Sequence, residues 1–444
     1  MLRSPNCVTP VSYMLPDNVR RRRPLAGVRA VEIALVWAGP YCGNLLGDLG
    51  AEVVKVEYIK DYPMRPINPP PEAPGFPDGR SGSRPWNRAA GFNAVNRNKL
   101  GLTLDLKDPA GVEAFKDLVA VSDIVFSNYA FGVMDSFGLG YDDLCKVRPD
   151  IIMLLMPGYG NTGPYKNVRS MGMSIDAVSG HSGLRGYPDL DLSMLSQVHH
   201  PDAVAAANGL FSLCLALHQR ARTGLGQLID MSQAESFMPH LGEVFLEYGI
   251  TGQPRERRGN IHPEMVPHGI YPCLGKDRWV AIAVRNQTDW VALCETMNIS
   301  ELASDSRFAT LEDRLRHRVE LDDEISRWTR ERDRYKVAEM LQERGIPAGP
   351  VLGSGADAYA DPHLQDRGFF QMVDHPDAGI HMLTGPIWKL ASEVEPLHEP
   401  APMLGEHNRY MLGELLGYNS ERLVTMERNQ IIGNVPVGAY QRPD

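Results

Sequence analysis

Short apolar runs alternate with segments of helical periodicity over the first half of the chain. Residues 28–35 and 51–57 are predicted strands, and residues 39–50 between them are a predicted helix that has Pro40 near its beginning. A strand, a helix and a second strand within about 30 residues form a βαβ unit with parallel strands. The pattern therefore predicts that a parallel sheet begins near residue 28.

The same alternation continues to about residue 231, with one interruption. Residues 60–90 contain eight prolines, which lack the backbone N–H that helices and sheets require, so a long irregular segment is predicted there. Further strands are predicted at 102–106, 123–126, 151–156 and 228–231, and further helices at 109–121 and 203–222. This order of elements predicts an α/β fold with a doubly wound, Rossmann-like parallel sheet.

The pattern changes near residue 235. Residues 269–273 and 278–284 alternate like the strands of a hairpin around the turn 275–277, and charged helices with a period near 3.6 follow to residue 343. We predict a large α/β domain over residues 1–235, a smaller α+β domain over 236–345, and a C-terminal segment, 346–444, that returns to the large domain.

Composition excludes several classes of function. The 444 residues include 45 Lys and Arg against 55 Asp and Glu, a formal net charge of −10 that argues against nucleic acid as a partner. No apolar stretch reaches the ~18 residues of a membrane span, and no secretory signal precedes the basic run Arg20–Arg23, which we interpret as a solvated tail. The six cysteines are far apart, which is typical of free thiols in a reducing cytoplasm.

The familiar cofactor motifs are missing. Glycines 39, 43, 47 and 50 do not form G-x-G-x-x-G, and neither a P-loop nor a G-x-S-x-G elbow occurs. His199 and His200 are adjacent, so both rings cannot share one helix face, and we predict no metal site.

Asp202 is the residue whose position invites a chemical interpretation. It stands at the beginning of the predicted helix 203–222, where an aspartate commonly caps exposed backbone N–H groups. The same donors would keep the carboxylate ionised and would stabilise an oxyanion formed beside it, so that Asp202 could attack an activated acyl group. The residue pattern alone leaves both interpretations open.

Several segments, in this order over about 380 residues, resemble the landmarks of the class III CoA-transferases, the formyl-CoA and carnitine CoA-transferase family. They are 24–29 (PLAGVR), 38–40 (AGP), 49–57 (LGAEVVKVE), 96–99 (NRNK), 104–107 (LDLK), 158–164 (GYGNTGP), 223–227 (TGLGQ), 230–232 (DMS), 345–350 (GIPAGP) and 404–407 (LGEH). The family's nucleophilic aspartate lies 21 residues before the threonine of T-G-x-G-Q. Here that threonine is Thr223, so the resemblance assigns the role to Asp202.

The resemblance implies the chemistry and the partners. Asp202 would attack an acyl-CoA thioester, an aspartyl-CoA thioester would follow through a mixed anhydride, and a carboxylic acid acceptor would collect the CoA, with no metal or redox cofactor. Family members form interlocked dimers, so a homodimer or a heteromer with a related subunit is expected. By position in the motifs, the CoA contacts would be Val36, Trp37, Ala38, Leu104, Asn128 and Tyr129, with Lys99 as a basic partner for the phosphates.

Departures from the family pattern narrow the range of possible substrates. Leu35 and Trp37 replace a His and a Gln of formyl-CoA transferase, and Tyr58 and Ser136 replace arginines near its nucleotide, which argues against formyl-CoA or oxalate. Trp37 and the pair Met171 and Met173 indicate either a roomier apolar acyl pocket or ordinary core residues. The segments 91–99 and 267–273 resemble the branch that uses succinyl-CoA with aromatic or branched dicarboxylates, such as the (R)-benzylsuccinate CoA-transferases.

Two other functions stay open. An α-methylacyl-CoA racemase on the same fold needs two opposed acid–base groups, but the histidine of its G-H-D segment is replaced by Met171 here, leaving Asp176, His199 or His200 as substitutes. A non-catalytic subunit of a heteromeric transferase is the second alternative. The presence of Asp202 argues against it, because a silent subunit needs no nucleophile.

Overall fold

A computed structural model describes residues 23–60, 64–353, 355–391 and 399–439. The chain divides into two compact units. The first consists of Met1–Gly180, Gln197–Glu243 and Gly368–Asp444, as far as these are described, and the second of His181–Ser196 and Val244–Arg367. Each unit has its own hydrophobic core.

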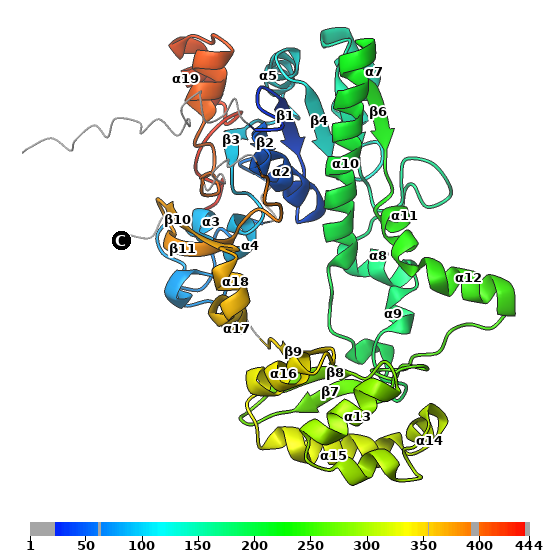
Figure 1. Cartoon of the computed structure of the whole chain (residues 1–444). Helices are drawn as coiled ribbons and strands as arrows, with labels where there is room; N and C mark the ends of the chain where they lie inside the picture. The colour runs from blue at the N-terminus through cyan, green and yellow to red at the C-terminus, as the bar shows by residue number, and fades with distance from the viewer. Residues whose placement is uncertain (1–22, 61–63, 354, 392–398, 440–444) are drawn as a thin grey trace, which may run out of the picture. The chain divides into compact units, whose positions relative to one another are not determined.

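A six-stranded parallel sheet forms the centre of the first unit (Figure 1). Its strands lie in the order β3-β2-β1-β4-β5-β6, and every neighbouring pair is parallel. The strands are β1 (Arg29–Ile33), β2 (Glu52–Glu57), β3 (Lys99–Thr103), β4 (Ile124–Ser127), β5 (Ile152–Leu155) and β6 (Gln227–Asp230). This is the strand order of the doubly wound Rossmann fold, so the predicted fold class is confirmed.

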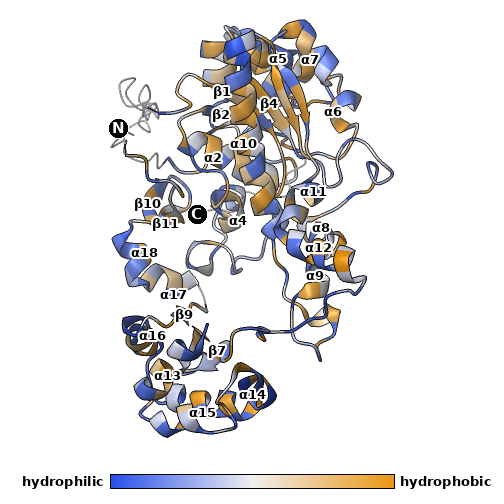
Figure 2. Cartoon of the chain, turned by 45° about the vertical axis from the view of Figure 1, so that its right-hand side comes forward, coloured by the Kyte–Doolittle hydropathy of each residue, from blue (hydrophilic) through white to orange (hydrophobic). Residues whose placement is uncertain are grey.

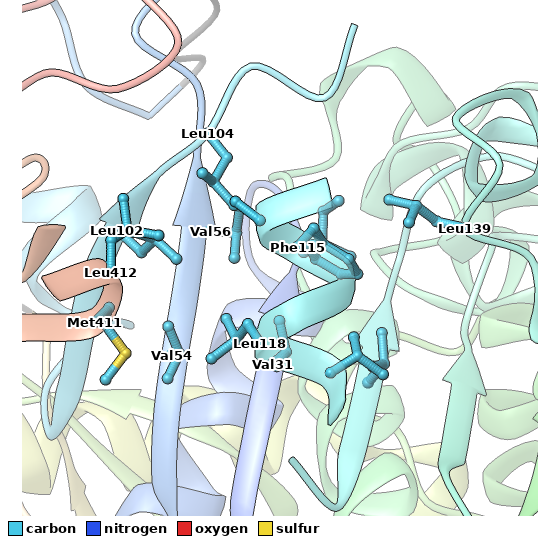
Figure 3. Close-up of a cluster of buried hydrophobic side chains, with 14 of the residues drawn as sticks. Val31, Val54, Val56, Leu102, Leu104, Phe115, Leu118, Leu139, Met411 and Leu412 are labelled. Carbon is cyan, nitrogen blue, oxygen red and sulfur yellow. The ribbon is translucent and has the colours of Figure 1, made fainter. Parts of the chain in front are cut away.

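Helices cover both faces of this sheet. On one face, α2 (Ala38–Asp48) and α10 (His200–Thr223) pack against the strands through side chains such as Leu45 and Leu213, both fully buried. On the other face, α5 (Pro109–Ala120) contributes Phe115 and Leu118, and the C-terminal segment contributes Met411 and Leu412 (Figure 3). Strands β1 to β5 are therefore buried on both faces, as is usual for parallel strands, whereas the edge strand β6 is partly exposed, with Leu228 at 45%. The strand β4 carries hydrophobic colours in Figure 2.

The other elements of the first unit are short. They are η1 (Pro77–Gly79), α3 (Pro85–Arg88), α4 (Ala90–Asn93), α6 (Val133–Ser136), α7 (Tyr141–Val147), α8 (Gly172–Val178), α11 (Gln233–Phe237), η3 (Met238–Leu241), β10 (Phe370–His375), β11 (Gly379–Thr384), η5 (Arg409–Leu415) and α19 (Ser420–Arg428). The proline-rich residues 64–84 form turns and the single short helix η1.

The second unit is built on the three-stranded antiparallel sheet β7-β8-β9. Its elements are α9 (His181–Leu184), η2 (Leu192–Met194), β7 (His268–Pro272), β8 (Trp279–Ala283), α13 (Gln287–Thr296), η4 (Ser300–Ser304), α14 (Leu311–Arg316), α15 (Arg318–Arg330), α16 (Arg334–Glu343), β9 (Ala348–Val351), α17 (Gly355–Ala360) and α18 (Pro362–Asp366), with α12 (Gly242–Thr251) at its beginning. The predicted hairpin of β7 and β8 is confirmed, and its turn contains two residues in the left-handed region, Gly275 and Asp277.

Two expectations need correction. Strand β3 begins at Lys99, three residues before the predicted strand, because the charge of Lys99 is paired inside the protein and does not end the strand. In the basic run, Arg23 is 7% exposed and donates to the carbonyl of Asp48, so it is not a solvated residue. Arg20–Arg22 and Cys7 lie outside the described residues, and the other five cysteines are free thiols.

The structure adds one observation on membranes. Within the described ranges, no helix combines the length and the apolar composition needed to cross a bilayer.

Candidate active site

Two adjoining cavities lie at the carboxyl ends of the sheet strands. The first, of about 420 Å³, is lined by residues that follow β1, β2, β3 and β4. The second, of about 380 Å³, is lined by residues that follow β1, β4 and β5, and by the first turns of α8 and α10. They share Leu35, Val36, Tyr129, Ala130 and Arg169. The shared wall follows β1 and β4, the strands at which the order of the sheet reverses, which is where α/β folds bind nucleotides.

The loop after β1 has a backbone conformation that its sequence does not favour. Val36 has a φ of +62°, in the left-handed region that a β-branched residue rarely adopts. The side-chain amide of Asn128 holds the preceding residue: it accepts from the N–H of Leu35 at 2.8 Å and donates to the carbonyl of Leu35 at 2.8 Å. Asn128 therefore fixes the wall between the two cavities.

Trp37 and Ala38 follow this loop at the beginning of α2. The indole ring of Trp37 stacks on Tyr41 with a centroid distance of 5.8 Å and meets the ring of His199 edge-on at 5.8 Å. The backbone N–H of Ala38 interacts with the carboxylate of Asp202. The beginning of α2 thus lies beside the beginning of α10.

Asp202 lies in the first turn of α10, and its carboxylate borders the second cavity. The residue is 6% exposed, and its Oδ2 atom has no hydrogen-bond partner among the described residues. A methyl group added at Gly172 would overlap this oxygen, so the absence of a side chain at Gly172 is what lets α8 approach the carboxylate. The helix-cap interpretation of Asp202 is wrong, because α10 begins at His200 and its N-cap position is occupied by His199, which leaves Asp202 inside the first turn.

The electrostatics of Asp202 are set by competing effects. Burial raises the pKa of its carboxyl group above the usual value for aspartate, whereas the charge of His199 and the backbone N–H of Ala38 lower it. Burial is the larger effect. The carboxylate is therefore poorly solvated and more basic than that of a surface aspartate.

Lys99 does not occupy the position expected for a phosphate ligand. Its ammonium group is completely buried, lies 2.7 Å from Oε2 of Glu32, and donates to the carbonyl of Pro40 at 2.6 Å and to Asn96 at 2.9 Å. Burial lowers the pKa of Lys99 to about 8. Lys99 lines neither cavity, so the structure gives it a role in the core beneath α2.

Four of the remaining six expected contacts line the cavities. Leu104 is 1% exposed and lines the first cavity, Asn128 lines the second, and Val36 and Tyr129 line both. Trp37 and Ala38 contribute to the surroundings of Asp202 and do not line either cavity.

Sequence reasoning missed the cations at the cavities. In the first cavity, Glu57 accepts two hydrogen bonds from Arg65, each of 2.8 Å, and Asp105 accepts one from Tyr58 at 2.9 Å. Lys107 and Arg169 have no carboxylate partner among the described residues and also line this cavity. The sequence could have indicated both residues, because they lie in or near segments that resemble the family. Lys107 ends the segment 104–107, and Arg169 follows the segment 158–164 by five residues.

The residues considered for a racemase are arranged differently from what that chemistry needs. Met171, at the position of the racemase histidine, lines the second cavity and is 54% exposed. Asp176 is 2% exposed and lines neither cavity. Among the described residues, no histidine lines either cavity, and no cluster of three His, Cys, Asp or Glu side chains could hold a metal ion.

A Rossmann-like sheet with two cavities at its switch point, one of them bordered by the buried carboxylate of Asp202, is the architecture of a nucleotide-binding protein. Comparison with known proteins gives the family: residues 25–408 match the model of CoA-transferase family III, and the chain belongs to that family. The prediction of a class III CoA-transferase is thereby confirmed.

Relatives agree with this assignment. The chain is 33% identical over 417 residues to the succinyl-CoA–D-citramalate CoA-transferase of Chloroflexus aurantiacus, covering 94% of this chain and 100% of the relative. It is 32% identical over 420 residues, with the same coverage, to the beta subunit of the succinyl-CoA–L-malate CoA-transferase of that organism. The crystal structure of a CAIB/BAIF family protein from Brucella suis superposes with a TM-score of 0.77 at 31% identity, covering 88% of this chain and 99% of that one.

Proposed function

We propose that the chain transfers CoA from succinyl-CoA to a small dicarboxylate, with Asp202 as the nucleophile. The observation that carries the proposal is a buried carboxylate with an unpartnered Oδ2 atom at the edge of the second cavity. The names of two relatives, which pair succinyl-CoA with citramalate or malate, support the donor and a four-carbon acceptor chain. An aromatic dicarboxylate such as benzylsuccinate stays a prediction.

The two cavities suit the two parts of an acyl-CoA. The nucleotide and its phosphates would occupy the first cavity, near Lys107 and Arg169, because these cations are not neutralised by neighbouring carboxylates. The pantetheine arm would pass the shared wall at Val36 and Tyr129. The thioester carbonyl would then reach Asp202 in the second cavity.

The proposed reaction proceeds through four acyl substitutions. Asp202 attacks the thioester carbonyl of succinyl-CoA, the C–S bond breaks, and CoA leaves as a thiolate from a mixed anhydride. The thiolate attacks the Asp202 carbonyl of that anhydride, which releases succinate and forms an aspartyl-CoA thioester. The acceptor carboxylate repeats both steps in reverse and leaves as its CoA thioester. No net proton is transferred, so the site must exclude water rather than supply an acid and a base.

An oligomeric form is part of the proposal. Apolar side chains are exposed along α10, such as Phe211 at 62% and Leu215 at 52%, and along α12, such as Leu246 at 64% and Ile250 at 75%. Exposed apolar surface of this kind is typical of an interface between chains. We expect an interlocked dimer or a heteromer with a related subunit, and one relative is itself named as a beta subunit. Light scattering of the purified chain tests this expectation.

Trapping of the acyl-enzyme tests the proposal. The protein is incubated with succinyl-CoA and then with hydroxylamine, and peptides are analysed by mass spectrometry. A hydroxamate on Asp202 is expected in the wild type and in D142N, whose exposed carboxylate lies on α7, and no hydroxamate is expected in D202N. If no residue is trapped but the α-protons of acyl-CoA exchange with deuterated water, the chain is a racemase. If neither occurs until a homologous chain is added, it is a dependent subunit.

A further inference from the structure

The second cavity has a simple distribution of charge. Of the described residues that line it, Asp202 is the only acidic one, and Lys166 and Arg169 are the cationic ones. Lys166 and Arg169 have no carboxylate partner in the described parts of the chain. The cavity where the acyl group reacts is therefore positively charged overall, although the catalytic group itself is an anion.

The two cations have different positions. Arg169 is exposed and lines both cavities, at the wall where the pantetheine arm would pass. Lys166 lines the second cavity and not the first, and its ammonium group lies 4.7 Å from the centroid of the Phe131 ring, which lines the same cavity. A cation held over an aromatic face is restrained without being neutralised, so the N–H groups that do not face the ring stay available to a ligand.

From this arrangement we propose that Lys166 binds the free carboxylate of the dicarboxylate substrates, the one that never carries CoA, and thereby selects dicarboxylic over monocarboxylic acids. The inference rests on the proposed function. It names a specificity-determining residue for both the donor and the acceptor, since succinate and a malate-like acid each keep one free carboxylate throughout the transfer.

The charge of the site changes during the reaction in a way that suits this role. In the free enzyme, the charges of Lys166, Arg169 and ionised Asp202 add to +1. In the aspartyl-CoA thioester, the carboxylate of Asp202 is replaced by a neutral thioester, and the sum rises to +2. The cavity therefore attracts an anionic acceptor most strongly at the stage when the acceptor must enter.

Butyrate is the matched probe, because it replaces the free carboxylate of succinate by a methyl group. In K166M, the KM for a dicarboxylate acceptor is expected to rise about 10- to 100-fold, as when a charge-assisted hydrogen bond is lost, while the KM for butyrate changes less than about threefold. K166R should restore most of the preference. R169M should weaken the use of succinyl-CoA and butyryl-CoA by similar factors, because Arg169 lies at the shared wall.

A binding measurement separates this inference from the proposed function. D202N, which cannot turn over, is titrated with succinyl-CoA and with butyryl-CoA, with and without K166M. Loss of the preference for succinyl-CoA in the double variant supports the role of Lys166, even if the wild type proves inactive as a transferase. An unchanged ratio of the two affinities overturns it, as does a preference that R169M abolishes and K166M does not.

Discussion

The Oδ2 atom of Asp202 lies against the backbone of Gly172, at the beginning of α8, so closely that a methyl group at residue 172 would overlap it. This contact predicts the effect of Gly172→Ala. The added Cβ must displace the carboxylate, and a displacement of about 1 Å costs on the order of 100-fold in rate. We expect kcat to fall by about that factor with little change in the KM for acyl-CoA.

Gly183→Ala is the matched control, because a Cβ at this helical glycine would meet no other atom within 4 Å. Steady-state kinetics of the two variants and circular dichroism of their folded state are the measurements. A Gly172→Ala enzyme with the kcat of the wild type would show that Asp202 is free to move away from α8.

We expect His199 to influence the pH below which the rate falls. The pKa of Asp202 is raised by burial and lowered in part by the charge of His199, and the proposed attack requires the ionised carboxylate. Replacement of His199 by Gln removes the lowering effect, so the pKa of Asp202 rises further. The acid limb of kcat/KM against pH should therefore move to higher pH.

His218→Gln, at an exposed position further along α10, should leave that limb in place. The comparison is a pH–rate profile of each enzyme with a saturating acceptor. An acid limb that His199→Gln moves to lower pH, or does not move, contradicts the assigned interaction.

Val36 should be replaceable by glycine without loss of stability. Its left-handed backbone costs about 1–3 kcal/mol for a β-branched residue, and glycine adopts that conformation freely. We expect Val36→Gly to leave the free energy of unfolding within about 1 kcal/mol of the wild type, whereas Val54→Ala, in the buried core, should lower it by about 2 kcal/mol.

Val36→Gly should instead weaken the binding of acyl-CoA, because the side chain of Val36 lines both cavities. A several-fold rise in the KM for acyl-CoA is expected, with kcat less affected. Chemical denaturation and steady-state kinetics measure the two effects separately, and a large loss of stability would rule out the backbone explanation.

We expect His375 to make the first unit sensitive to acid. Its Nδ1 atom accepts from the N–H groups of Asp377 and Ala378, each at 3.0 Å, which requires the neutral ring, and burial lowers its pKa to about 4. The unfolded chain has the ordinary value of about 6.5, so it binds more protons than the folded chain between pH 6.5 and 4. The free energy of unfolding should fall by up to about 3 kcal/mol from this residue as the pH drops through that range.

His375→Asn keeps an acceptor near Nδ1 and does not titrate. Denaturation at pH 7, 5.5 and 4.5 should show that the free energy of unfolding falls less with decreasing pH in this variant than in the wild type. His407, whose pKa burial also lowers to about 4, should contribute to the loss of stability that remains. An equal decrease in the free energy of unfolding in the two proteins would show that His375 does not cause the acid sensitivity.

The sequence predicted the sheet because each of its strands is apolar and is bounded by helical or turn residues. The prediction was wrong at Lys99. Its charge led us to begin the predicted strand at residue 102 and to expect a phosphate ligand, whereas β3 begins at Lys99 and its charge is paired with Glu32. The partner that neutralises this charge, Glu32, is 67 residues away in the sequence, and no local pattern reveals that contact. The same limit applies to Lys166, because only the folded chain brings it to the cavity that contains Asp202.

The buried charges beneath α2 also have a consequence for folding. Glu32 and Lys55 are register partners in β1 and β2, their charged atoms lie 2.8 Å apart, and Lys99 approaches the same carboxylate from β3. A slip of one residue between β1 and β2 would turn Lys55 to the opposite face of the sheet and break its buried ion pair with Glu32, at a cost of about 3–5 kcal/mol. These buried ion pairs thus favour the native register of the strands over misaligned ones. The loops that line both cavities follow these strands, so their positions depend on the same register.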